Sequence, residues 1–234
     1  AKKAAEEALK KTALATLMAA VFVPSVLVSL SNIIDAKWTL AMERADEAGI
    51  LLAHSLLNSN AGHRPVSLVG FSFGARMIIA CLKELARYQV IWVNQQQEMT
   101  NDEDRGSMIA SFRKKSMKQN NQHDTLCHRE PASIVEDVIL MGTPASVNKN
   151  TWDSCRGVVA GRLVNCYSNK DMILALMYRA KNLTSALLNP PVGIQEVKAA
   201  GIENFDVSDL VASHGEYNVA VNEILHLVGY DQPR

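Results

Sequence analysis

A serine between two glycines is the first feature of this sequence that could do chemistry. Residues 70–74 read Gly-Phe-Ser-Phe-Gly, a GxSxG pentapeptide centred on Ser72. The apolar run VSLV precedes it and ARMIIACLKELAR follows it, which predicts a strand, a tight turn and a helix. A nucleophile elbow needs this context, in which Gly70 and Gly74 let strand and helix approach closely. The alternative is a Gly-Ser turn that only packs a strand against a helix.

The same turn would place Ser72 at the N-terminus of a helix. Backbone N–H groups and the helix dipole favour a negatively charged oxygen there. The residue after a serine nucleophile supplies one such N–H in this kind of elbow. We therefore expect the N–H of Phe73 to be one donor of an oxyanion hole.

A serine nucleophile needs a base, and the base needs an acid that orients it. In an α/β-hydrolase the order along the chain is serine, acid, histidine. Of the six histidines, only His214 lies between the last predicted strand and the last predicted helix. Asp171 follows the predicted strand over 161–168, where the acid is expected. The competing carboxylates lie on or beside the last predicted strand, where local capping is the expected role: Asp206, Asp209 and, more weakly, Glu203.

Structural interpretations stand beside these assignments. His214 could be a loop histidine near a helix start, and Asp171 could be the N-cap of the helix after it. His123, Cys127 and His128 lie close together and are metal-ligand types, but no fourth ligand has a suitable spacing. We therefore expect no metal site and no cofactor.

The elements that must position these residues alternate along the chain. Near-continuous apolar strands separated by helices predict a mostly parallel sheet covered by helices on both faces. The fold class is α/β, interpreted as a partial α/β-hydrolase fold. Strands are predicted at 65–70, from Ile134, at 161–168 and at 202–210, and helices at 37–58, 74–88, 173–180 and 217–228.

Two segments differ from this core. Residues 12–34 contain no charged residue and are long enough to span a bilayer, although Pro24 interrupts them. Three interpretations of this segment remain open, namely a membrane-associated segment, a lid and a buried broken helix. Residues 90–132 are rich in Asn, Gln and balanced charge, and too few are apolar to offset the entropy of ordering, so they predict a flexible polar insertion. The expected domains are a helical segment over 1–34 and a core over 35–234 that contains this insertion.

Composition narrows the function classes. Lys and Arg number 24, as do Asp and Glu, so the formal net charge is zero. A nucleic-acid-binding protein usually carries a basic excess, so no nucleic-acid partner is expected. The four cysteines form no CxxC pair, which favours free thiols in a reducing, intracellular compartment. The chain begins at Ala1 without an initiator methionine, which indicates a fragment whose upstream targeting signal could be missing.

Five blocks, in order, resemble the family of transmembrane and coiled-coil domain-containing protein 4 and its fungal and protist relatives. They cover nearly all of the chain except about 90–132. The resemblance implies membrane association and an α/β-hydrolase-like fold whose motif positions fall on Ser72, Asp171 and His214. It also implies that a second oxyanion donor comes from an upstream strand and loop that are not evident here. The blocks are AEEALKKTALATLMAAVFVPSVLVSLSNIIDAKW, RPVSLVGFSFGARMIIACLKELA, EDVILMGTPA, VVAGRLVNCYSNKDMILALMYR and GIENFDVSDLVASHGEYN.

Two functions are consistent with these observations. The first is an esterase or lipase-like serine hydrolase that acts on a small-molecule or lipid ester at a membrane. The lipid is inferred from the apolar segment and from the resemblance, and not from any pocket residue. The second is a non-catalytic membrane-trafficking or protein-interaction scaffold that retains the hydrolase fold. The intact Ser, Asp and His set favours the hydrolase, because a scaffold has no chemical need for all three; haloperoxidase or transferase chemistry on the same elbow is a weaker third possibility.

Overall fold

The computed structural model describes residues 36–59, 64–104, 129–181 and 190–230. Two compact units divide the chain at residue 41, and the sheet lies within the second, Met42–Arg234. The apolar segment predicted over 12–34 lies outside the described residues. So do 105–128 of the predicted insertion, with His123, Cys127 and His128.

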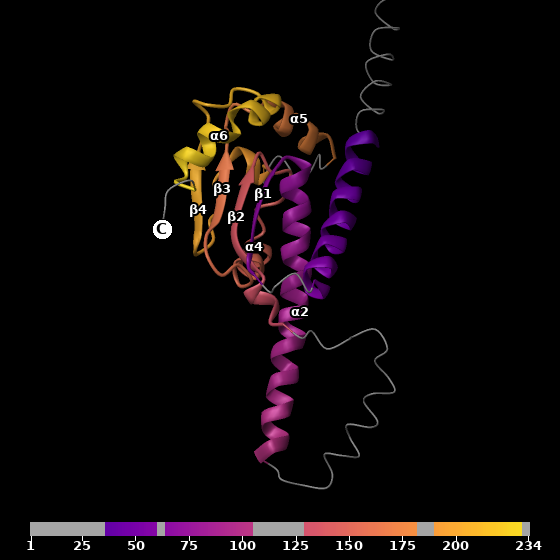
Figure 1. Cartoon of the computed structure of the whole chain (residues 1–234). Coiled ribbons are helices and arrows are strands. Elements are labelled where there is room, and N and C mark those ends of the chain that lie inside the picture. The colour runs from indigo at the N-terminus through magenta and orange to yellow at the C-terminus, as the bar shows by residue number, and fades with distance from the viewer. Residues whose placement is uncertain (1–35, 60–63, 105–128, 182–189, 231–234) are drawn as a thin grey trace, which may run out of the picture. The chain divides into compact units, whose positions relative to one another are not determined.

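Four parallel strands form one sheet in chain order, as Figure 1 shows. Every neighbouring pair is parallel, so each connection returns to the amino end of the sheet and all carboxyl ends share one edge. The predicted α/β class and parallel sheet are confirmed. The strands are β1 (Val66–Phe71), β2 (Val135–Met141), β3 (Leu163–Tyr167) and β4 (Ile202–Asp206).

Helices cover both faces of this sheet, as predicted. Along β2, Val138 and Leu140 pack with two helices on one face, whereas Ile139 and Met141 pack with another helix on the opposite face. This alternation follows from the two-residue repeat of a strand, and burial on both sides explains the continuous apolar run. The first face carries α2 (Phe73–Asp104) and α4 (Lys149–Arg156), and the second carries α6 (Tyr217–Leu227).

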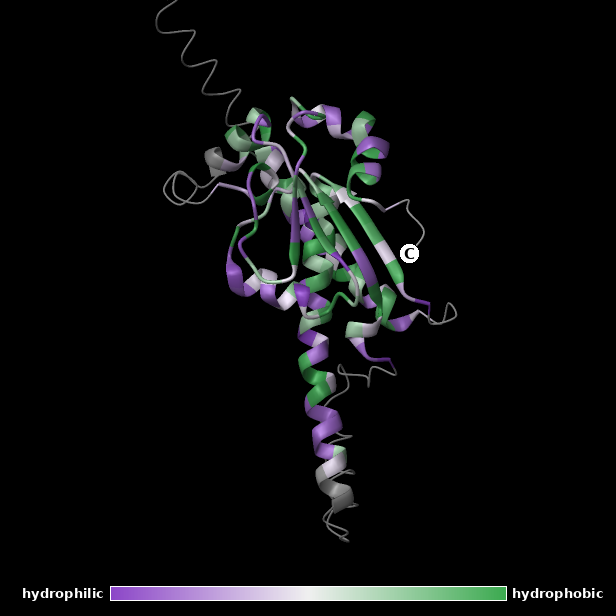
Figure 2. Ribbon diagram, turned by 90° about the vertical axis from the view of Figure 1, so that its left-hand side faces the viewer, coloured by the Kyte–Doolittle hydropathy of each residue, from purple (hydrophilic) through white to green (hydrophobic). Residues whose placement is uncertain are grey.

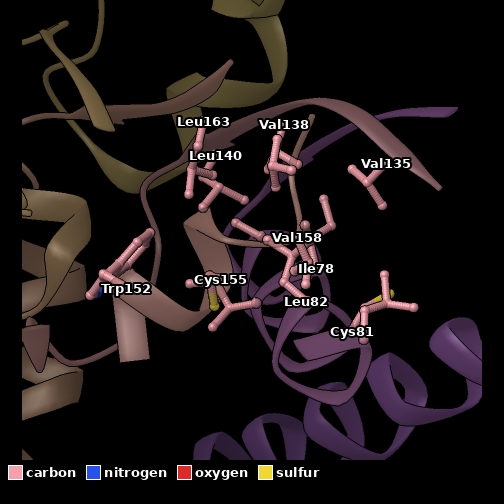
Figure 3. Packing of buried hydrophobic residues seen from close by; sticks show 14 of the residues in the cluster. Ile78, Cys81, Leu82, Val135, Val138, Leu140, Trp152, Cys155, Val158 and Leu163 are labelled. Carbon is pink, nitrogen blue, oxygen red and sulfur yellow. The ribbon is translucent and has the colours of Figure 1, made fainter. Parts of the chain in front are cut away.

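The larger core lies between β2 and the two helices of the first face. Figure 3 shows Ile78 and Leu82 of α2 together with Trp152 and Cys155 of α4 beneath the strands. The sequence pattern did not predict α4. Its eight residues include only Trp152 and Cys155 as buried positions, so its apolar periodicity is too short to recognise. Asn148 begins the helix by accepting hydrogen bonds from two backbone N–H groups.

The predicted end of the second helix was wrong. We expected it to stop near Tyr88, where the polar insertion was predicted to begin, but α2 continues to Asp104. Figure 1 shows this continuation extending beyond the sheet, and Figure 2 shows that it is largely hydrophilic. Residues 89–104 contain no Gly or Pro and include four Gln and two Glu, two residue types with high helix propensity. Their polarity therefore indicates exposure to solvent, and not loss of the helix.

Three free cysteines are buried in the described core, and we predict that they are unreactive in the native protein. Burial raises the pKa of Cys81, Cys155 and Cys166 to about 12. Because the thiolate is the nucleophile, iodoacetamide at about pH 8 should leave all three unmodified until denaturant is added. Peptide mass spectrometry measures the modification site by site. Rapid modification of any of the three without denaturant would contradict this packing.

Candidate active site

Ser72 occupies a tight turn between β1 and α2. Its φ is 51°, the only positive φ of a non-glycine residue among those that the structure describes. This left-handed conformation costs an L-residue on the order of 1–2 kcal/mol. Two backbone hydrogen bonds hold it, one from the Ser72 N–H to the Met141 carbonyl at 2.9 Å and one from the Arg76 N–H to the Ser72 carbonyl at 3.1 Å. The predicted strand–turn–helix arrangement is therefore present.

The two glycines of the pentapeptide differ in what they contribute. A Cβ at Gly70 would lie 2.7 Å from Cδ1 of Ile78 and 2.9 Å from the backbone N of Ala75. A side chain at that position would push β1 and α2 apart, as predicted. A Cβ at Gly74 would meet nothing within 4 Å. The expectation that Gly74 is needed for close approach was therefore wrong.

The structure brings together the three residues chosen from chain order. His214 opens the short 3-10 helix η3 (His214–Glu216), between β4 and α6. Its Nε2 lies 2.7 Å from Oγ of Ser72, and its Nδ1 lies 2.6 Å from Oδ2 of Asp171. Since an ionised carboxylate only accepts, Nδ1 carries the proton toward Asp171 and Nε2 is free to accept from the serine hydroxyl.

Asp171 makes both of the contacts that the sequence left as alternatives. Oδ2 faces His214, and Oδ1 accepts a hydrogen bond from the backbone N–H of Leu174 at 2.9 Å. That second bond caps the first turn of α5 (Met172–Lys181). The side chain is fully buried, so these partners offset the cost of burying its charge. The capping bond also fixes the carboxylate rotamer that faces the imidazole.

The competing residues have other partners. Asp206 accepts a hydrogen bond from the Ser208 backbone N–H at 2.9 Å, as expected for local capping, and that turn ends β4 earlier than predicted. Asp209 lies 3.4 Å from Lys170, and Glu203 pairs with Arg162 at 2.6 Å. Among the other histidines, His54 contacts Glu84 at 3.0 Å.

Tyr217 and Gly142 support the imidazole, and sequence reasoning missed both. The buried Tyr217 ring meets the His214 ring edge to face, with centroids 6.0 Å apart. Gly142 has a φ of 53°, and a Cβ there would lie 2.6 Å from the Tyr217 ring. The Gly in the predicted strand end MGTP was a usable signal, whereas nothing in the sequence singled out Tyr217.

The loop before His214 is held by Glu216. Its carboxylate accepts a hydrogen bond from the backbone N–H of Ala212 at 2.7 Å and another from the Ser213 hydroxyl at 3.2 Å. The Ala212 N–H is the main cause of a lowered pKa at Glu216. The carboxylate is therefore charged at neutral pH and pins the segment from which the imidazole projects.

Arg76 connects the elbow to the loop after β2. Its Nη1 donates to the Pro144 carbonyl at 2.7 Å, and its Nη2 donates to Oδ2 of Asp46 at 2.6 Å. The same loop receives a hydrogen bond from the Gly193 N–H to the Thr143 carbonyl at 2.9 Å. Arg76 is the one charged residue in GARMIIA, and that was the only sequence signal of its role.

The oxyanion site has one candidate donor, the N–H of Phe73, which begins the 32-residue helix α2. Its role stays a prediction. Within the described sheet β1 is an edge strand that pairs only with β2. Val69 and Phe71 are exposed along it. The second donor that the resemblance implies, from an upstream strand and loop, stays a prediction.

The described residues include no group of three or more His, Cys, Asp or Glu side chains placed to hold a metal ion. No helix among them is both long and apolar enough to cross a membrane.

Fold and site together define an α/β protein with a Ser-His-Asp array at the carboxyl edge of a parallel sheet. The chain belongs to the family described as protein of unknown function (DUF726), which matches residues 1–95 and 123–231. The unmatched internal residues, 96–122, fall within the insertion predicted over 90–132.

Several longer proteins are similar to this chain. It is 37% identical over 215 residues to transmembrane and coiled-coil domain-containing protein STS1 of Oryza sativa subsp. japonica, covering 92% of this chain and 26% of that protein. It is 31% identical over 225 residues to probable lipase MIL1 of Saccharomyces cerevisiae, covering 96% of this chain and 17% of that protein. It is also 30% identical over 227 residues to uncharacterized membrane protein F35D11.3 of Caenorhabditis elegans, covering 97% and 30%. The chain thus spans less than a third of each relative, and no solved structure matches it.

Backbone strain at Ser72 makes a stability prediction. Ser72→Ala and Ser72→Gly both remove the hydroxyl, but only glycine adopts a φ of 51° without steric cost. We expect the glycine variant to be more stable by about 1 kcal/mol, after allowing for its more flexible unfolded chain. Urea unfolding of the two variants measures the difference. An alanine variant as stable as the glycine variant would show that the turn is unstrained.

The contacts of Arg76 make a second stability prediction. Arg76→Met leaves the Pro144 carbonyl without its charged donor, so it should lower the free energy of unfolding by about 2 kcal/mol. Asp46→Asn should cost less than about 1 kcal/mol, because the Asp46 side chain is 44% exposed and water screens the pair. Urea unfolding of both single variants and the double variant separates the two contacts. If the two single variants lost equal free energy of unfolding, the ion pair with Asp46 would contribute more than the hydrogen bond to Pro144, against this prediction.

Proposed function

We propose that this protein is a serine hydrolase of the α/β-hydrolase type that cleaves ester bonds. One observation carries the proposal, namely the hydrogen-bonded series from Ser72 through His214 to Asp171, with separations of 2.7 and 2.6 Å. These residues come from three chain segments and follow one another as nucleophile, acid and base, which is the chain order of this class of enzyme. The strained turn at Ser72 and the complete burial of Asp171 support the same reading.

The geometry supports a two-stage acyl transfer. Oγ of Ser72 attacks the ester carbonyl while Nε2 of His214 takes the hydroxyl proton. The Phe73 N–H would donate to the oxygen that becomes negative, together with an upstream donor. The carbon–oxygen bond to the alcohol then breaks, and His214 gives its proton to the leaving oxygen. A water molecule, deprotonated by His214, cleaves the acyl-serine in the same way and releases the acid.

Asp171 would act through the histidine. Its carboxylate keeps the proton on Nδ1 of His214 and stabilises the imidazolium that forms during attack. The capping bond from Leu174 holds the carboxylate in place between turnovers. A fixed acid of this kind lowers the cost of ordering the imidazole in each cycle.

The substrate class we propose is a lipid ester at a membrane. The yeast relative carries the name probable lipase, and the rice and nematode relatives are named as transmembrane or membrane proteins. Family membership and these names support membrane association of the chain. The apolar segment over 12–34 would be its contact with the bilayer, by spanning it or by lying on it.

A fluorophosphonate probe tests the hydrolase directly. We expect covalent labelling of the wild type and a loss on the order of a thousandfold or more in Ser72→Ala and His214→Ala. Ser154→Ala and His226→Ala are matched controls, because both side chains are exposed on helices and should leave labelling unchanged. A longer chain with the upstream residues is tested in parallel, and labelling of that chain alone would place a required donor upstream. A folded wild type that labels in neither length would overturn the proposal in favour of a non-catalytic scaffold.

A further inference from the structure

The outer face of α5 is apolar, although it is exposed. Met172, Ile173 and Leu176 are 70%, 50% and 64% exposed. At 100° per residue these three lie on one side of the helix, while Leu174 and Tyr178 are buried on the other. A surface helix normally turns polar residues outward, so a contiguous apolar face of this kind marks a contact surface.

This face lies next to the Ser-His-Asp array. The helix begins directly after Asp171, and its Leu174 N–H bonds to the same carboxylate that faces His214. It also packs against η3, which carries His214. Figure 1 shows α5 at the carboxyl end of the strands. A ligand that covers the outer face of α5 is therefore brought beside Ser72.

The charges in and next to this helix favour contact with the surface of an anionic lipid bilayer. From Met172 to Lys181 the sequence contains no acidic residue, whereas Arg179 and Lys181 stand near its end and Lys170 precedes it. Lys170 is only weakly neutralised, since Asp209 lies 3.4 Å away and both side chains are well exposed. Apolar residues flanked by cations are the pattern of helices that lie in the headgroup region of anionic bilayers.

We propose that α5 is a second lipid-contacting surface of this protein, beside the Ser-His-Asp array and separate from the apolar segment over 12–34. Met172, Ile173 and Leu176 enter the boundary between headgroups and acyl chains, and Lys170, which is well exposed, meets anionic headgroups. An exposed helix face is convex, so it suits an extended lipid surface better than an enclosed small molecule. The inference deepens the proposed hydrolase, because a docked α5 would bring lipid esters to Ser72, but the contact itself does not depend on catalysis.

A fluorescent label on α5 tests the contact locally. An environment-sensitive fluorophore is attached through Leu176→Cys in a Cys127→Ser background, because the other cysteines are buried. Vesicles of phosphatidylcholine with phosphatidylserine should shift its emission to the blue. The matched control is Val219→Cys on α6, which is 77% exposed and should stay in a water-like environment. Adding Met172→Ser and Ile173→Ser to the α5-labelled protein should raise the lipid concentration for half-maximal shift by about tenfold or more, whereas Val219→Ser should not.

Several outcomes would overturn the proposal. The emission of the label at residue 176 could stay at its value in water while the protein sediments with vesicles. The emission of both labels could instead shift equally, or the protein could fail to bind vesicles. A shift that appears without vesicles and rises with protein concentration would assign the face to a second copy of the chain, and one present in a longer chain alone would assign it to an upstream segment. None of these readouts requires hydrolysis, so failure of the lipid contact is distinguishable from failure of fluorophosphonate labelling.

Discussion

The rest of the site depends on the backbone conformation of Ser72. A residue at φ 51° is held there only because the surrounding structure determines it, and here β2 and α2 each contribute one hydrogen bond to its peptide groups. The close approach at Gly70 is part of the same constraint. If the turn relaxed, Oγ of Ser72 would move out of hydrogen-bond distance of His214. The contact between His214 and Asp171 would then have no nucleophile to activate.

The loop after β2 connects the turn at Ser72 to the residues that pack around His214. The Met141 carbonyl receives the Ser72 N–H, Gly142 leaves room for the Tyr217 ring, and the Pro144 carbonyl receives Arg76. One short stretch thus holds the serine, packs the ring that lies against His214 and ties both to the first turn of α2.

Asp171 links the site to the proposed lipid surface. One carboxylate oxygen faces the imidazole, and the other begins α5, whose exposed apolar face starts at the next residue. Burying this charge requires both partners, so the helix start and the orientation of the histidine are set by the same side chain. A membrane contact on α5 would therefore lie on the helix that Asp171 caps.

The sequence by itself determined the α/β class, the parallel sheet and the choice of Ser72, Asp171 and His214, because apolar runs, GxSxG and chain order are local signals. It failed where the signal was short or misleading, as at α4, whose eight residues contain only two buried positions. It also failed at α2, where polarity was taken for loss of the helix. Only the tertiary structure decided that Asp171 both caps α5 and faces His214, and that Tyr217 and Arg76 support the site. The contacts of Asp171 with His214 and of Arg76 with Pro144 join residues 43 and 68 positions apart. Such contacts are set by tertiary packing, which has no periodicity along the chain.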